Sequence, residues 1–65
     1  MKDNKIVYVS EIYMDEKRTL QQGIMYKYDD DMEREYLRGT INPHLTELVF
    51  TMHFNKDMEL IKEEK

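Results

Sequence analysis

The feature that most limits what this chain can fold into is a regular alternation of large apolar side chains with other types. Over 48–54 every second residue is Leu, Phe or Met. A helix there would leave Phe50 and Phe54 outside its apolar stripe, so an extended strand is the better interpretation. Runs rich in β-branched and aromatic residues over 6–14 and 20–28 show a similar pattern. The sequence therefore predicts a mostly β fold.

The segment after residue 28 permits two interpretations. As a helix, it would have Asp30 as N-cap, Glu33 three residues later and Gly39 just past its end. As a strand, it would turn through its acidic residues and place Leu37 and Ile41 on one face. The strand is favoured, because a helix this short is weak without packing.

The whole pattern predicts one small domain over residues 1–65. We expect about five antiparallel strands in a meander that curls toward a small barrel. An α+β fold with one short helix near residues 31–38 is the alternative.

Length and composition limit the class of protein. The chain has 65 residues and no cysteine, so neither disulfides nor thiolate metal sites can stabilise it. Its longest apolar run is the four residues 6–9, far short of the ~20 that span a bilayer, and the N-terminus lacks a signal-peptide pattern. We expect a soluble cytoplasmic protein that does not bind membranes.

Apolar side chains occur on both parities of the predicted strands. The richer parity, which includes Tyr8, Ile12 and Met14, is the predicted core face. The opposite face is also rich in apolar residues, so we expect it to be covered by the disputed segment as a helix, by a second copy in a homodimer, or by another protein. The remaining alternative is that these residues are scattered single exposures that need no partner. The residues concerned are Val7, Val9, Tyr13, Met25, Tyr36, Val49 and Ile61.

Negative charge is concentrated in one segment. Residues 29–35 carry five acidic side chains and one arginine, which equals the net charge of −4 of the whole chain. The segment is interpreted either as a solvated loop or as a surface that steers a basic partner into contact. The predicted partner-binding residues are Asp29, Asp30, Asp31, Glu33 and Glu35 for steering, and Tyr13, Tyr36 and Val49 as anchors.

The side chains needed for catalysis are scarce. Ser10 is the one serine, and His44 and His53 lie nine residues apart without metal-binding spacing. The sequence also lacks a glycine-rich phosphate loop. We expect no enzyme activity, no cofactor and no metal, and we expect His53 to be a surface or interface residue.

The functional prediction is a small acidic intracellular module that binds another protein with a basic surface and regulates it, with inhibition as the expected direction. The composition is skewed toward Lys, Ile, Asn and Tyr, as AT-rich codons produce, and this suggests a phage or mobile element as the source. One alternative is a small barrel that binds single-stranded nucleic acid, for which the acidic charge is unfavourable. The other is a subunit that only assembles with itself.

Overall fold

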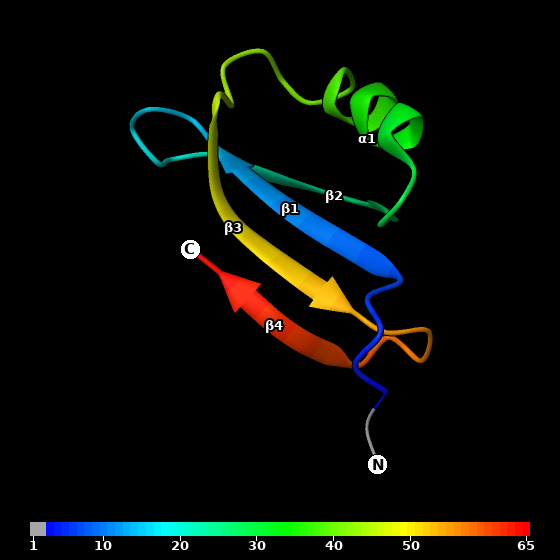
Figure 1. Cartoon of the computed structure of the whole chain (residues 1–65). Helices are drawn as coiled ribbons and strands as arrows, with labels where there is room; N and C mark the ends of the chain where they lie inside the picture. The colour runs from blue at the N-terminus through cyan, green and yellow to red at the C-terminus, as the bar shows by residue number, and fades with distance from the viewer. Residues whose placement is uncertain (1–2) are drawn as a thin grey trace.

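The structure is a computed structural model, and it describes residues 3–65 (Figure 1). It contains four strands and one helix. In chain order these are β1 (Tyr8–Met14), β2 (Gln21–Lys27), α1 (Asp31–Arg38), β3 (Glu47–Phe54) and β4 (Leu60–Glu64).

The four strands form one antiparallel sheet in the order β2-β1-β3-β4. Since β2 and β3 both run antiparallel to β1, they point the same way on either side of it. The connection through α1 therefore carries the chain across one face of the sheet, from one side of β1 to the other (Figure 1). No helix within residues 3–65 is both long and apolar enough to cross a bilayer.

The predicted mostly β fold is confirmed, and so is the alternative that placed a short helix near residues 31–38. The five-strand meander is wrong, because the predicted third strand is α1, and the sheet does not close into a barrel. With α1 in place of that strand, the chain returns to pair with β1 instead of continuing from β2.

Local signals fix the ends of α1. The Asp30 side chain caps the helix by accepting a hydrogen bond from the Glu33 backbone N–H at 2.8 Å. The Glu33 carboxylate in turn accepts from the backbone N–H of Lys27 at 3.2 Å, which ties the helix to the end of β2. Gly39 follows the helix, and its N–H donates to the carbonyl of Glu35. These contacts and the packing of Leu37 against the core supply the support that a short helix needs.

One buried asparagine organises the turn between β3 and β4. Asn55 is fully buried, and its side chain accepts from the backbone N–H groups of Asp57 and Glu59. Its amide donates to the carbonyl of Asp3 and to the Glu59 carboxylate. The turn also holds Met58 at a φ of 62°. Asn55 thus joins the start of the described chain to the last hairpin.

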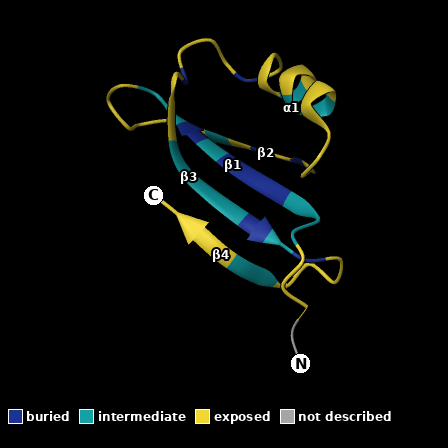
Figure 2. Ribbon diagram, in the orientation of Figure 1, coloured by how far each residue is buried: buried dark blue, intermediate teal, exposed yellow. Residues whose placement is uncertain are grey.

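The sheet has a covered face and an open face. The core lies between this covered face and the layer above it: Val9, Tyr13, Ile24 and Tyr26 come from the sheet, and Ile41 and Leu45 come from the segment that follows α1. Figure 2 shows that burial is concentrated in β1, whereas most of α1 is exposed. The strand register places a second set of apolar side chains on the opposite, open face: Tyr8, Ile12, Met14, Met25, Phe50, Met52, Phe54 and Leu60.

The prediction that the parity of Tyr8, Ile12 and Met14 forms the core face is therefore wrong for β1. Val9 and Tyr13, expected on the opposite face, are the residues that the helix layer covers. Gly23 confirms the register, since a Cβ there would lie 2.8 Å from Cδ1 of Ile12 on the open face. This is the close approach for which the sequence favours glycine in a strand.

Candidate functional site

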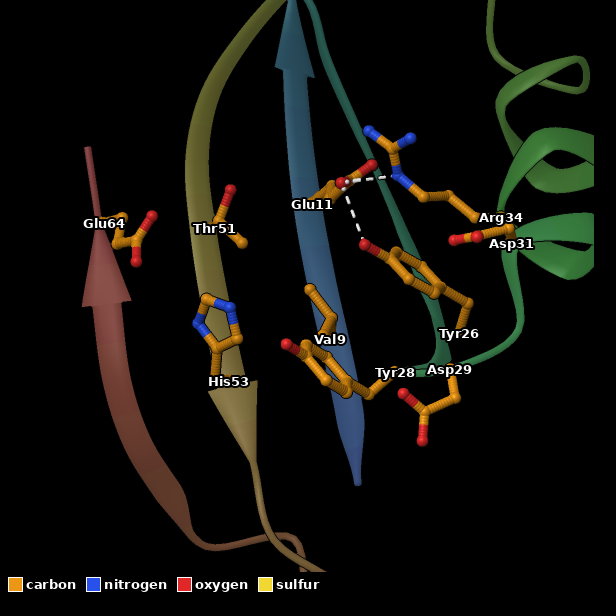
Figure 3. Close-up of a pocket in the computed structure, with 10 residues that line it drawn as sticks. All are labelled: Val9, Glu11, Tyr26, Tyr28, Asp29, Asp31, Arg34, Thr51, His53 and Glu64. Atoms are coloured by element: carbon orange, nitrogen blue, oxygen red, sulfur yellow. Dashed lines mark hydrogen bonds and ion pairs between the residues drawn. The ribbon is translucent and has the colours of Figure 1, made fainter. Parts of the chain in front are cut away.

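A carboxylate lies in the middle of the covered face. Glu11 is only 3% exposed, yet three donors surround it. The Tyr13 hydroxyl donates to Oε1 at 2.7 Å and the Tyr26 hydroxyl to Oε2 at 3.0 Å, both from the sheet. Arg34 reaches in from α1 and donates its Nε–H to Oε2 at 2.9 Å (Figure 3). The cluster joins helix and sheet through the ion pair between Glu11 and Arg34. The two tyrosine hydroxyls provide further hydrogen bonds to the same carboxylate.

These contacts change how the cluster titrates. Burial alone would raise the pKa of Glu11, but the hydrogen bonds from Tyr13, Arg34 and Tyr26 outweigh it and hold that pKa below its usual value. Burial and the hydrogen bond to Glu11 raise the pKa of Tyr26 to about 12. The same two causes raise the pKa of Tyr13. Glu11 therefore stays ionised and both phenols stay protonated at neutral pH.

Beside this cluster lies a hollow of about 470 Å3 that is open to solvent (Figure 3). One wall comes from the start of α1 and the end of β2, and the other from β3 and β4. His53 lies on the β3 wall and is 8% exposed, so it is not the surface residue that was expected. Its Nδ1 atom has no hydrogen-bond partner among the described residues. The lining residues are Val9, Glu11, Tyr26, Tyr28, Asp29, Asp31, Arg34, Thr51, His53 and Glu64.

The hollow has an excess of negative charge. Arg34 is its one cationic side chain among the described lining residues, and that guanidinium is already bound to Glu11. Glu64 pairs with Lys62 at 3.3 Å. Within residues 3–65, Asp29 and Asp31 make neither an ion pair nor a side-chain hydrogen bond. These two carboxylates are available to a cation that approaches from outside.

The five predicted acidic residues do come together around the start of α1, but they are not equivalent. Asp30 and Glu33 serve as the helix cap and the link to β2. Glu35 pairs with Arg34 at 3.5 Å and with Arg38 at 3.1 Å, which neutralises much of its charge. Only Asp29 and Asp31 are unpaired charges, and both line the hollow, so the steering prediction now rests on these two residues.

The predicted apolar anchors separate more widely. Tyr36 is 73% exposed on α1, four residues after Met32, which is 85% exposed. Residues four apart share one face of a helix, so these two side chains form an exposed apolar pair beside the acidic residues. Tyr13 is instead 6% exposed and bonded to Glu11, and Val49 is half-buried at the irregularity in the pairing of β1 with β3. Neither belongs to the same surface as Tyr36.

Sequence reasoning did not identify the buried cluster. Glu11 sits among apolar residues on β1, and Arg34 lies in an acidic run where it resembles a solvated charge. The available signal was Glu11 itself, because a carboxylate that is buried at the centre of a strand needs hydrogen-bond donors. Tyr13 on the same strand and Tyr26 on the neighbouring strand can supply them. Tyr13 and Arg34, which a nucleic-acid surface would need exposed, are both engaged by this carboxylate.

Among residues 3–65, no three side chains of the metal-binding types are grouped so that they could hold a metal ion. No protein-family model, curated protein or solved structure matches the chain. Function is therefore inferred from the geometry of the described residues.

Proposed function

We propose that the protein is a protein-binding module, and that it receives a lysine or arginine side chain of its partner in the hollow between α1 and β4. The observation that carries the proposal is the pair of unpaired carboxylates, Asp29 and Asp31, on the wall of the hollow. Arg34, the one cationic side chain among the described lining residues, is already bound to Glu11. A basic side chain would supply the charge that is missing there.

The surroundings of these carboxylates suit a protein partner. Tyr28 is 49% exposed and lines the hollow, so its ring can pack against the stem or the charged head of an entering basic side chain. Met32 and Tyr36 offer exposed apolar area on the adjacent helix. Tyrosine and methionine surrounded by charged residues are typical of interface anchors with a polar rim.

The chemistry also favours a mode of regulation. A basic surface that receives acidic side chains is a surface that otherwise attracts phosphate or another acidic chain. Occupying it denies it to those ligands, so we propose inhibition by competition. The net charge of −4, concentrated in this segment, would speed the encounter at low ionic strength.

A tetra-arginine peptide tests the site without knowledge of the natural partner. In an NMR titration of the whole chain, we expect the backbone amides of Tyr28, Asp29 and Asp31 to shift and saturate. Replacing both aspartates, Asp29→Asn with Asp31→Asn, should weaken binding about tenfold or more, since two charges in a partly desolvated hollow are removed. The matched control is Glu16→Gln with Asp57→Gln, which removes the same charge from exposed turns.

Equal weakening by both double variants would show that only net charge matters and would overturn the hollow as the binding site. Shifts spread over the whole surface, without saturation, would do the same. A tetra-glutamate peptide should produce no response at these amides.

A further inference from the structure

The open face of the sheet has the composition of an interface centre. Its apolar set, named above, contains three aromatic residues, three methionines, one isoleucine and one leucine. Interface centres are enriched in aromatic residues and methionine and depleted of charge. At the strand positions assigned to this face, the charged side chains lie on the edge strands or at the sheet end: Lys27, Glu47 and Glu63.

The molecule is thin, and its solvent-accessible surface is larger than that of a typical compact monomer of the same mass. Its Cα trace measures 13 Å along the shortest axis, about the depth of one sheet and one helix layer, for which packed layers lie ~10 Å apart. A compact monomer of 8.0 kDa should expose about 4,450 Å2. The chain exposes 4956 Å2, and a face without a covering layer accounts for such an excess.

We infer that a second copy of this chain covers the open face, so that two sheets pack face to face in a two-fold dimer with both α1 helices outside. This inference is independent of the proposed peptide-binding hollow, which lies on the covered face. The chain has neither a disulfide nor a third layer, and a dimer would supply the buried apolar area that a 65-residue domain lacks.

The positions of the charges select one of two packings. Aligned sheets related by a two-fold axis either place β2 over β4 of the partner copy, with the axis along the strands, or place β2 over β2, with the axis across them. Lys27 lies on β2 and Glu63 on β4, both on the open face. The axis along the strands brings each Lys27 to the edge that carries Glu63 of the other copy. The alternative stacks β4 on β4 and brings the two Glu63 side chains toward each other, so the first packing is favoured.

The area sets the expected strength. Four strands ~4.8 Å apart and about seven residues long cover about 19 by 23 Å in projection. Side chains make the real surface larger than this projection, so contact between two such faces removes on the order of 1,000 Å2 of accessible surface from water. That area is at the lower limit for a specific interface. We therefore expect a reversible dimer that dissociates on dilution through the micromolar range.

Sedimentation velocity over a dilution series tests the dimer. The weight-average mass should approach twice 8.0 kDa at the highest concentrations and fall to 8.0 kDa on dilution. Met25→Asp places a charge in the open face at a side chain that is already 42% exposed, so it should fold and remain monomeric. Tyr28→Asp is the matched control, because it is similarly exposed, at 49%, and lies on the covered side. It should dimerise like the unmodified chain.

Charge exchange tests the packing. Lys27→Glu and Glu63→Lys should each weaken dimerisation about tenfold, and the double variant should restore it to within about threefold. A double variant weaker than either single variant would overturn the axis along the strands.

A chain that stays monomeric at several hundred micromolar would overturn the dimer, and so would a dimer that Met25→Asp leaves intact. If the chain is monomeric while tetra-arginine still binds, the dimer fails and the proposed function stands. If dimerisation follows the variants while tetra-arginine does not bind, the reverse holds.

Discussion

The two faces of the same sheet differ in a way that hydrophobicity alone does not explain. The covered face holds a buried carboxylate, two phenols and a guanidinium among its apolar residues, whereas the open face holds aromatic residues and methionines without a central charge. The covered face, which packs against the protein's own helix layer, is the more polar of the two. Polar clusters fix how helix and sheet fit together, and apolar area without fixed polar partners is suited to contact with another surface.

Neighbouring residues on β2 offer the sharpest test of this contrast. Ile24 is 7% exposed on the covered face, and Met25 is 42% exposed on the open one. Under conditions where the chain is monomeric, Ile24→Ala should lower the free energy of unfolding by about 3 kcal/mol, through lost burial and a cavity. Met25→Ala should cost less than about 1 kcal/mol. Urea unfolding at low protein concentration measures both.

If Ile24→Ala does not fold, Ile24→Val should still cost about 1 kcal/mol. Equal costs for Ile24→Val and Met25→Ala in the monomer would mean that the two faces are buried alike, and the contrast would be lost.

The buried ion pair gives the next largest effect. Arg34→Met leaves the Glu11 carboxylate, 3% exposed, with two phenol donors and without its cation. We expect the free energy of unfolding to fall by about 2–3 kcal/mol at pH 7. This is less than the loss expected when a fully buried ion pair is broken, because the Arg34 side chain is 30% exposed. The control is Arg38→Met on the same helix, where an exposed pair with Glu35 should contribute less than about 0.5 kcal/mol.

The pH dependence follows from the lowered pKa of Glu11. A carboxyl whose pKa is lower in the folded state stabilises the fold above its unfolded pKa, near 4.5, and loses that contribution as the pH falls through the folded value. The cost of Arg34→Met should therefore shrink below pH 4. A cost independent of pH would show that Arg34 acts through packing of its stem and not through its charge.

Tyr26 gives the smallest effect and a signature at high pH. Its pKa is raised from 10.0 to about 12, so the folded state favours the protonated phenol. That contribution is complete below pH 10 and is lost as the pH rises toward 12. Tyr26→Phe should cost about 1–2 kcal/mol at pH 7, through the lost hydrogen bond to a carboxylate. Its unfolding free energy should also decline less between pH 10 and 12.

Tyr36→Phe is the control for that measurement, since Tyr36 is 73% exposed on the helix. It should behave like the unmodified chain at both pH values. An unchanged alkaline slope in Tyr26→Phe would assign the loss of stability to another group.

Strand periodicity predicted β1, β2 and β3 well, because alternation is a local property of the chain. The cap at Asp30 also predicted where α1 begins. What could not be predicted is that the helix wins over the strand at residues 31–38. That outcome depends on two contacts with residues distant in sequence, Arg34 with Glu11 and Leu37 with the core.

On β1 the choice of core face failed for a related reason, whereas Ile24 and Tyr26 on β2 were correctly predicted to be core residues. Tyr8, Ile12 and Met14 are more apolar as a set than Val9, Glu11 and Tyr13, so counting apolar residues selects the open face. Burial follows from which face α1 crosses, and there a carboxylate is acceptable because three donors meet it. The acidic cluster was predicted as a group, but only the structure separates the unpaired Asp29 and Asp31 from their engaged neighbours.

The sheet order described above also affects whether further chains can add to an edge of the sheet. Of the two edge strands, β4 ends in Lys62, Glu63 and Glu64, so charged side chains lie along the backbone groups that another strand would have to meet at that edge. Repulsion between like edges opposes lateral addition of chains, which is the route to fibres. If the open faces pair as we infer, the pair presents no further open face, and the charged end of β4 opposes the addition of another strand at that edge.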